Sequence, residues 1–190
     1  MVFDWKENKD EALRNGICEE QIFSTTNIVM KAENGRVENH TFRNFPKLEF
    51  KSDTLVENCV FEDCGDVTFD GCKVNGCVFQ RIETVFCDNS TFTESKFQEI
   101  FCDNDLIISL EDGEISHCVF EDIELRNDAY LCVGYGSPWI EYCVFNRIST
   151  TRADRELFHC EDTVGKFFKM KKEYCIVDEE TCEGLSTISG

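Results

Sequence analysis

The chain has 190 residues, of which 42% are hydrophobic and 30% charged, as in a globular protein with a single core. No apolar run is long enough to span a bilayer, and the amino terminus lacks the basic and apolar regions of a secretory signal. We therefore expect a soluble, cytoplasmic protein. With 38 acidic and 19 basic residues, the formal net charge is −19. This charge argues against direct binding to nucleic acid or to a membrane, and favours a protein partner with a basic surface.

Thirteen cysteines would indicate disulfides in a small secreted domain. The number is odd and no secretory signal is visible, so we expect reduced thiols. No C-x-x-C pair occurs, and His40, His117 and His159 lie far apart, so the usual spacing of zinc ligands is missing. The sequence thus predicts neither a metal nor another cofactor.

The first predicted element is a short helix over residues 4–16, with Asp4 as its N-cap and Gly16 near its end. Residues 1–25 contain no copy of the repeat that follows, and we expect them to form a cap over it. An uncapped repeat would expose unpaired backbone and apolar surface, which would favour an end-to-end homodimer.

A seven-residue motif recurs from residue 39 onward. Its fourth position is always phenylalanine, its second is Cys or Ser in all copies but the first, and its fifth and sixth are polar. The phenylalanines are separated by 19, 18, 18, 23 and 25 residues, so the segments between copies accept insertions, as in a solenoid. The copies are NHTFRNF (39–45), NCVFEDC (58–64), GCVFQRI (76–82), ESKFQEI (94–100), HCVFEDI (117–123) and YCVFNRI (142–148).

Each motif predicts a short strand. Its second and fourth side chains share one face of the strand, so a small residue and a phenylalanine point inward together. The polar pair at positions five and six is expected to form a corner, and the seventh residue turns inward again. The units are rich in Val, Phe, Thr and Cys and lack a 3.6-residue period, which excludes helices. The sequence therefore predicts an all-β fold, a right-handed parallel β-helix whose phenylalanines form a column roughly 24 Å long at about 4.8 Å per step.

We expect about six to seven coils in a single domain, with coils over residues 26–170 and a tail or cap over 171–190. The extra residues of the later coils, 103–114 and 127–139, are expected to lengthen one strand and bulge one corner. The degenerate seventh coil places Phe167 and Met170 at the last motif positions. The expected coils are 26–45, 46–64, 65–82, 83–100, 101–123, 124–148 and 149–170.

Residues 67–81, VTFDGCKVNGCVFQR, contain three consecutive five-residue steps in which a small or β-branched residue lies two positions before a larger one. This stretch resembles pentapeptide-repeat proteins. The resemblance covers part of the chain and implies a right-handed β-helix. Some members of that family are acidic proteins that imitate duplex DNA and bind topoisomerases. The paired residues are Val67 and Phe69, Cys72 and Val74, and Cys77 and Phe79.

The spacing departs from that family, whose regular members have four five-residue faces and a period of 20 residues. Here the interval is 18 residues in two cases and rises to 25. The broader similarity is to right-handed β-helices of the pectate-lyase-like kind, where units of the N-C-x-F-x-x-I type are also common. Both resemblances imply the same architecture.

Three functional classes remain open. No glycine-rich phosphate loop, nucleophile elbow or HExxH motif is present, so a non-catalytic recognition or scaffold protein acting through protein–protein contacts is favoured over an enzyme. The second class is an acidic DNA-mimic inhibitor of a DNA-binding enzyme. Residues 46–148 carry 21 acids and 7 bases, a net of −14, close to the roughly 14 charges on 24 Å of duplex DNA. The third is a carbohydrate-active β-helix enzyme, which would need paired carboxylates or a calcium site.

No catalytic residue is assigned, and the candidate interaction surface comes from the two long insertions. The first carries a dense group of acids. The second carries aromatic residues that either bind a partner from a protruding loop or pack along the flank of the column. The cysteines at motif position two, Cys59, Cys77, Cys118 and Cys143, are interpreted as core packing. The candidate surface residues are Asp103, Asp105, Glu111, Asp112, Glu114, Tyr130, Tyr135 and Trp139.

Overall fold

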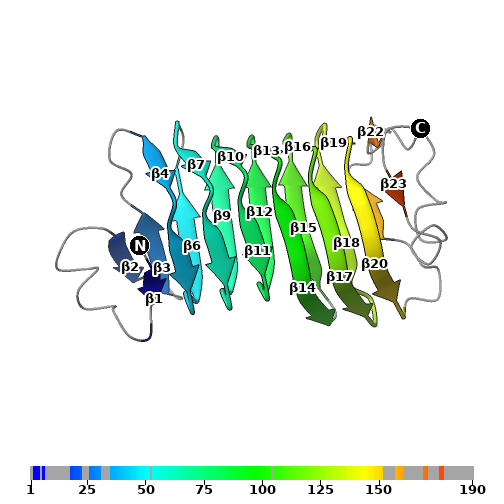
Figure 1. Cartoon of the computed structure of the whole chain (residues 1–190), viewed down its shortest axis with the longest axis horizontal. Helices are drawn as coiled ribbons and strands as arrows, with labels where there is room; N and C mark the ends of the chain where they lie inside the picture. The colour runs from blue at the N-terminus through cyan, green and yellow to red at the C-terminus, as the bar shows by residue number, and fades with distance from the viewer. Residues whose placement is uncertain are drawn as a thin grey trace.

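The protein is a parallel β-solenoid of about five turns, in which three sheets surround a common axis (Figure 1). The computed structural model describes residues 2–4, 6, 18–22, 26–30, 35–51, 53–103, 105–151, 157–160, 169–170 and 176–177. Among these residues, no helix has the length and apolar character needed to cross a membrane.

Successive turns contribute strands to three sheets, here called A, B and C. Sheet A contains β1 (Val2–Asp4), β5 (Thr41–Arg43), β8 (Val60–Glu62), β11 (Val78–Gln80), β14 (Lys96–Asp103), β17 (Val119–Arg126), β20 (Val144–Thr150) and β23 (Ile176–Val177). Sheet B contains β2 (Cys18–Ile22), β3 (Thr26–Met30), β6 (Lys47–Phe50), β9 (Asp66–Asp70), β12 (Thr84–Asp88), β15 (Leu106–Glu111), β18 (Tyr130–Tyr135) and β21 (Phe158–Cys160). Sheet C contains β4 (Arg36–Glu38), β7 (Leu55–Glu57), β10 (Lys73–Asn75), β13 (Thr91–Thr93), β16 (Glu114–Ser116), β19 (Trp139–Glu141) and β22 (Lys169–Met170). β2 and β3 pair antiparallel, whereas strands of successive turns pair in parallel.

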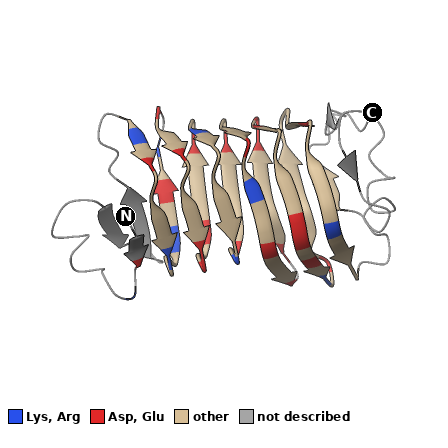
Figure 2. Cartoon of the chain, viewed as in Figure 1, with Lys and Arg blue, Asp and Glu red and all other residues tan. Residues whose placement is uncertain are grey.

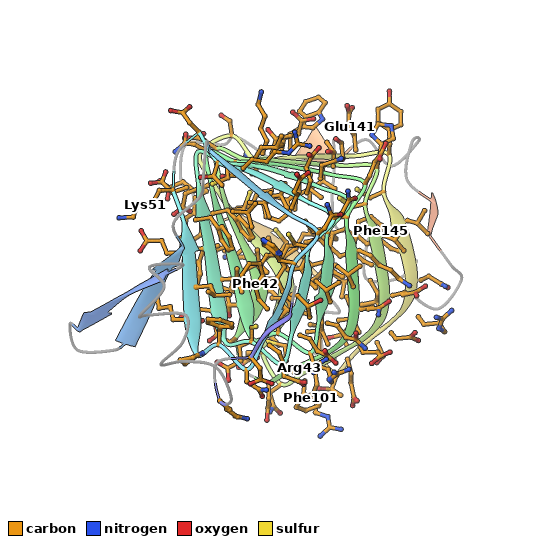
Figure 3. All side chains as sticks on the ribbon, turned by 60° about the vertical axis from the view of Figure 1, so that its left-hand side comes forward. Phe42, Arg43, Lys51, Phe101, Glu141 and Phe145 are labelled. Atoms are coloured by element: carbon orange, nitrogen blue, oxygen red, sulfur yellow. The ribbon has the colours of Figure 1, made fainter. Side chains whose placement is uncertain are left out.

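The motif phenylalanines form a continuous column on the inner face of sheet A, which confirms their predicted orientation. All six are at most 1% exposed, and Figure 3 shows the first and last of them, Phe42 and Phe145, inside the solenoid. Consecutive ring centroids lie 4.8–5.2 Å apart with interplanar angles of 5–15°. Phe69 of sheet B meets Phe61 edge to face at 5.8 Å, so rings from two sheets fill the core together.

Motif position two lies inside the corner between sheets C and A. Cys59, Cys77 and Cys118 there are at most 1% exposed. Their thiols donate hydrogen bonds to nearby carbonyls, as from Cys59 Sγ to Glu57 O at 3.3 Å. Ser95 takes the same position and its hydroxyl accepts the Cys77 N–H at 3.1 Å. The predicted role of these residues in core packing is confirmed.

Single residues with left-handed backbone form the corners. In one turn Gly71, Gly76 and Arg81 have φ of 65°, 61° and 51° at five-residue intervals. Most equivalent positions of the first four turns hold Asn, Asp or Gly, which adopt this conformation most readily. The prediction that motif positions five and six form the corner together is therefore corrected, because position five stays on the outer face of the strand. Each turn has three sheets, whereas regular pentapeptide-repeat proteins have four faces, and this difference accounts for the 18-residue interval between motif phenylalanines.

The later turns are longer, as expected, because their sheet A strands are extended; the bulge, expected at a corner, lies within strand β18 of sheet B. β14 and β17 have eight residues and β20 has seven, whereas β5, β8 and β11 have three. The N–H groups of Leu131 and Cys132 both donate to the carbonyl of Leu157, at 2.9 and 3.2 Å. This bulge lets two consecutive side chains point into the core, where both are buried.

For the ends, one expectation changes and another falls outside the described residues. Of the helix expected over residues 4–16 only Asp4 and Lys6 are described: Asp4 ends strand β1, and its carboxylate accepts the N–H of Lys6 at 2.9 Å, as an N-cap does. The solenoid has about five turns instead of six to seven, because the terminal strands, such as the two-residue β22 and β23, do not complete further turns.

The last unit also differs in register. Met170 belongs to sheet C, where it pairs with Ile140, and Phe167 lies outside the described residues. The residue in register with Phe145 in sheet A is Val177. The tail over 171–190, whose structure the sequence did not predict, thus supplies one strand.

Phe79 lies in the centre of the column, and replacing it with Asp tests the inward assignment. The Phe79→Asp variant should lose more than the about 3–5 kcal/mol that removal of a buried phenylalanine ring costs, because a charge is buried as well. Urea denaturation followed by circular dichroism measures the loss. Val78→Asp, on the outer face of the same strand, is the control and should cost less than about 1 kcal/mol. Near wild-type stability of Phe79→Asp would show that this column is not the core.

Candidate functional site

Nine cysteines, those whose side chains the structure describes, lie inside the solenoid. All nine are buried, and none of these nine forms a disulfide. Burial raises the pKa of Cys64 to about 12 and that of Cys72 to about 11, and it raises the pKa of Cys87 further. A reactive cysteine needs the opposite, an accessible thiolate.

Cysteine and histidine are adjacent in the sequence at Cys118–His117 and at Cys160–His159. Cys118 is fully buried, whereas the His117 ring stacks on Tyr142 with centroids 4.9 Å apart. His159 stacks on Tyr130 at 5.0 Å, and the side chain of Cys160 lies outside the described set. The first pair therefore does not form a nucleophile and base, as strand alternation predicts.

The eight candidate surface residues fall into two groups separated by the length of β15. Asp103, Asp105 and Tyr130 lie at the corner between sheets A and B. The other five lie at the corner between sheets B and C, where the later turn places aromatic rings above acids of the earlier turn: Glu111 is in register with Tyr135, and Glu114 with Trp139. The structure thus does not unite them in one site.

The aromatic residues lie in strands of the solenoid flank. Tyr130 and Tyr135 begin and end β18, and Trp139 begins β19; all three are half-buried. The alternative of packing along the flank therefore describes them better than a protruding loop. The most exposed aromatic side chain among the described residues is one that the sequence analysis missed, Phe101, which is 50% exposed. Its position between the inward-facing Ile100 and Cys102 could have predicted this orientation.

Opposite charges alternate along the outer edge of sheet A. Arg43 pairs with Glu62 at 2.6 Å, and Arg81 pairs with Asp63 at 2.7 Å and with Glu99 at 3.0 Å. Hydrogen bonds from Arg81 lower the pKa of Asp63. Figure 2 shows basic and acidic residues interspersed along the strands that this view displays.

A second corner carries acids without such partners. Asp70, Asp88 and Glu111 are in register at the ends of successive sheet B strands, and none of them forms an ion pair with a described lysine or arginine. Burial raises the pKa of Asp88, and the charges of Glu111 and Asp70 raise it further. The described residues nevertheless contain no group of three or more His, Cys, Asp or Glu side chains arranged to hold a metal ion.

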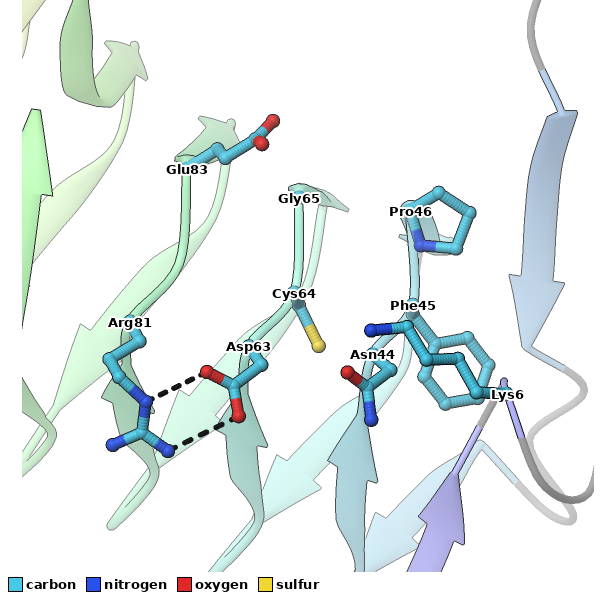
Figure 4. Close-up of a pocket in the computed structure, with 9 residues that line it drawn as sticks. All are labelled: Lys6, Asn44, Phe45, Pro46, Asp63, Cys64, Gly65, Arg81 and Glu83. Carbon is cyan, nitrogen blue, oxygen red and sulfur yellow. Dashed lines mark hydrogen bonds and ion pairs between the residues drawn. The ribbon is translucent and has the colours of Figure 1, made fainter. Parts of the chain in front are cut away.

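A hollow of about 310 Å³ lies on the corner between sheets A and B in the early turns (Figure 4). Its lining joins the Asp63–Arg81 ion pair to Cys64, Gly65 and Glu83. Gly65 is required there, because a Cβ atom would lie 2.2 Å from the carbonyl oxygen of Pro46. Since Asp63 is held ionised by Arg81, it is not suited to act as a general acid, which needs a raised pKa.

The buried cysteines should resist alkylation in the folded protein. Treatment with iodoacetamide at pH 8 is expected to leave the nine described thiols unmodified, whereas the same treatment in urea should label all of them. Peptide mass mapping gives the extent of alkylation at each cysteine. Rapid native labelling of Cys64 or Cys118 would contradict their burial.

Asp88→Asn should stabilise the protein at pH 7 by about 0.2–1 kcal/mol, the size of surface charge effects. The folded-state pKa of Asp88 is raised, so its ionisation disfavours folding, and this cost disappears as the pH falls through the raised pKa toward the unfolded value. Urea denaturation of the variant and the wild type at pH 7 and at pH 4 measures the difference in stability and its disappearance at low pH.

Asp63→Asn is the matched control with the opposite sign. The pKa of Asp63 is lowered, so its stabilising effect is present above the unfolded pKa and is lost as the pH falls through the folded one. This variant should be less stable than wild type at pH 7. If both variants shift stability in the same direction, the charge arrangement described above is wrong.

The sequence matches no known protein-family profile, and a search of curated proteins returns no match, so no relative supplies a function for these residues.

Proposed function

We propose that the protein is a non-catalytic recognition or scaffold protein that binds another protein through its outer faces. The observation that carries this proposal is the separation of inner and outer side chains. Inside the solenoid lie the described thiols, the phenylalanine column and the corner serines. On the outer faces, polar and aromatic side chains of successive turns are in register, so each lies one strand spacing from the next. Such a surface offers repeated contacts at fixed positions.

The charge of the chain defines the chemistry of the partner. A net charge of −19 repels other acidic surfaces and speeds encounter with basic ones. The ion pairs of sheet A neutralise one edge, so a basic partner would meet more acidic charge at the corner of Asp70, Asp88 and Glu111, which form no ion pair with a described lysine or arginine.

A DNA-mimic inhibitor is the second candidate, favoured by the in-register acids Asp70, Asp88 and Glu111. Strands of a parallel sheet lie about 4.8 Å apart, a spacing that differs from the about 1.7 Å of helix axis per charge in duplex DNA. The acids of this column alone would therefore reproduce only part of the charge density. The neutralised edge of sheet A also weighs against mimicry.

An enzyme acting on carbohydrate is supported least. The acids of the hollow include Asp63, whose pKa is lowered, and Glu83, while Asp88 with its raised pKa does not line this hollow. Such chemistry would need two carboxyl groups facing one cavity, one with a raised pKa and one with an ordinary pKa.

Affinity capture from lysate of the source cell, at low and at high salt, tests the proposal. We expect one or a few proteins to be recovered in amounts comparable to the bait, and identified by mass spectrometry. Outer-face charge reversals, such as Glu111→Lys or Asp105→Lys, should reduce recovery, whereas a substitution within the core that preserves folding, such as Cys118→Ser, should not.

Recovery of a DNA-processing enzyme that is lost as salt rises would favour the DNA-mimic candidate. Recovery of no protein in stoichiometric amount under either condition would contradict a recognition function. Equal effects of Cys118→Ser and of the charge reversals would also contradict it, because they would indicate binding to unfolded chains.

A further inference from the structure

Strand β14 extends beyond the strand that precedes it in sheet A. The ladder between β11 and β14 ends with the pair Gln80–Gln98, whereas β14 continues to Asp103. From Ile100 to Asp103, β14 pairs with β17, and no described strand pairs with its opposite edge. The longer strands that begin with β14 therefore create a step on the flank of the solenoid.

The backbone of Phe101 faces this open side. In a parallel ladder, the N–H and C=O of one residue point to the same neighbouring strand, and the next residue points the other way. Leu125 O accepts the N–H of Thr151 at 3.0 Å, and so points toward the following turn. Cys102 is in register with Leu125 and points the same way, so its neighbour Phe101 points toward the side where β11 has ended.

The corresponding step in sheet B is closed. Thr84 Oγ1 donates a hydrogen bond to the carbonyl of Leu106 at 3.1 Å. No described group makes such a hydrogen bond with the backbone of Phe101. An edge that lacks a ladder partner is a template for another strand.

The side chain of Phe101 adds an apolar contact at the same place. It is 50% exposed and points outward from the solenoid, as Figure 3 shows, and Arg126 Cζ lies 4.5 Å from its ring centroid. Exposed aromatic side chains held by a neighbour are common anchors of protein interfaces.

Charges around the step indicate a basic occupant. Glu83 directly precedes β12 in the preceding turn, and Asp105 follows the end of β14. Asp66 begins β9 and pairs with Lys47 at 3.9 Å; burial raises its pKa, Lys47 lowers it, and the charge of Asp105 raises it. Asp103, at the end of the edge, accepts a hydrogen bond from the neutral amide of Asn127. A second copy of this chain would bring its own net charge of −19 to these acids.

We propose that this step, formed by Ile100–Asp103 with Asp66, Glu83 and Asp105, binds an extended segment of another protein that contains lysine or arginine. The segment adds as a strand beside Phe101, its backbone completes the hydrogen bonds of the open edge, and its basic side chains pair with the surrounding acids. This inference rests on the proposed recognition function and specifies the chemistry of the partner.

A labelled decapeptide of alternating valine and lysine is the probe, with fluorescence anisotropy as the measurement at low salt. Phe101→Ser and Asp105→Lys should each weaken its binding at least tenfold. The matched controls are Tyr142→Ser, which removes another exposed aromatic ring, and Glu114→Lys, which makes the same charge change on sheet C. Both should change affinity less than twofold, and circular dichroism confirms that all four variants fold.

Two further measurements distinguish strand addition from general charge attraction. Hydrogen exchange should show new protection of the Phe101 amide when the peptide binds. A peptide of the same charge in which proline replaces every valine lacks the backbone N–H of every second residue and should bind at least tenfold more weakly.

Several results would overturn the proposal. These are no binding of the probe, a loss of affinity with Glu114→Lys equal to that with Asp105→Lys, equal affinity for the proline peptide, or dimerisation of the protein through this edge when no peptide is present. A partner captured from lysate by wild type and equally by Phe101→Ser would reject this step while leaving the recognition function standing. Failure of both the capture and the peptide experiment would reject both.

Discussion

The in-register stacking of identical side chains is the interaction on which the rest of the structure depends. Each motif phenylalanine lies against the phenylalanine of the next turn at 4.8–5.2 Å, which matches the distance between hydrogen-bonded strands. Ring contact and backbone ladder therefore reinforce each other at every step. The corner cysteines and serines fit this arrangement, because only small side chains leave room for the rings on either side.

The sequence predicted the inside of the protein better than its outside. The six phenylalanines and the cysteines beside them could be assigned because a buried column requires the same residue type at each turn. The number of sheets could not, since it depends on single left-handed residues such as Gly71 and Arg81, and charged or aromatic residues occupy several of these corners. The end regions were also not predictable, because their strands do not repeat the motif: Val177 continues sheet A where Phe167 was expected.

The candidate surface illustrates the same limit. The insertions were recognised from their length, but whether they formed loops or strands depended on pairings between residues some 20 positions apart. Glu111 and Tyr135 meet across such a pairing, whereas Asp103, at the end of β14, is separated from Glu111 by the length of β15 although the two are close in sequence. The exposed Phe101 was missed because its neighbours are all apolar, and only the alternation along β14 shows that it faces outward. The outer columns differ in their charges: acids are paired with arginines along sheet A, whereas Asp70, Asp88 and Glu111 form no ion pair with a described lysine or arginine.

The register between turns also governs how the protein can come apart. Each turn contacts only the turns directly before and after it, so cooperativity is passed from neighbour to neighbour along one dimension. Unfolding is then expected to begin at the ends and to advance turn by turn, and the turns between β6 and β17 should exchange their amide protons last. The same geometry makes length adjustable, because duplicating one whole turn adds a copy of every contact and disturbs none.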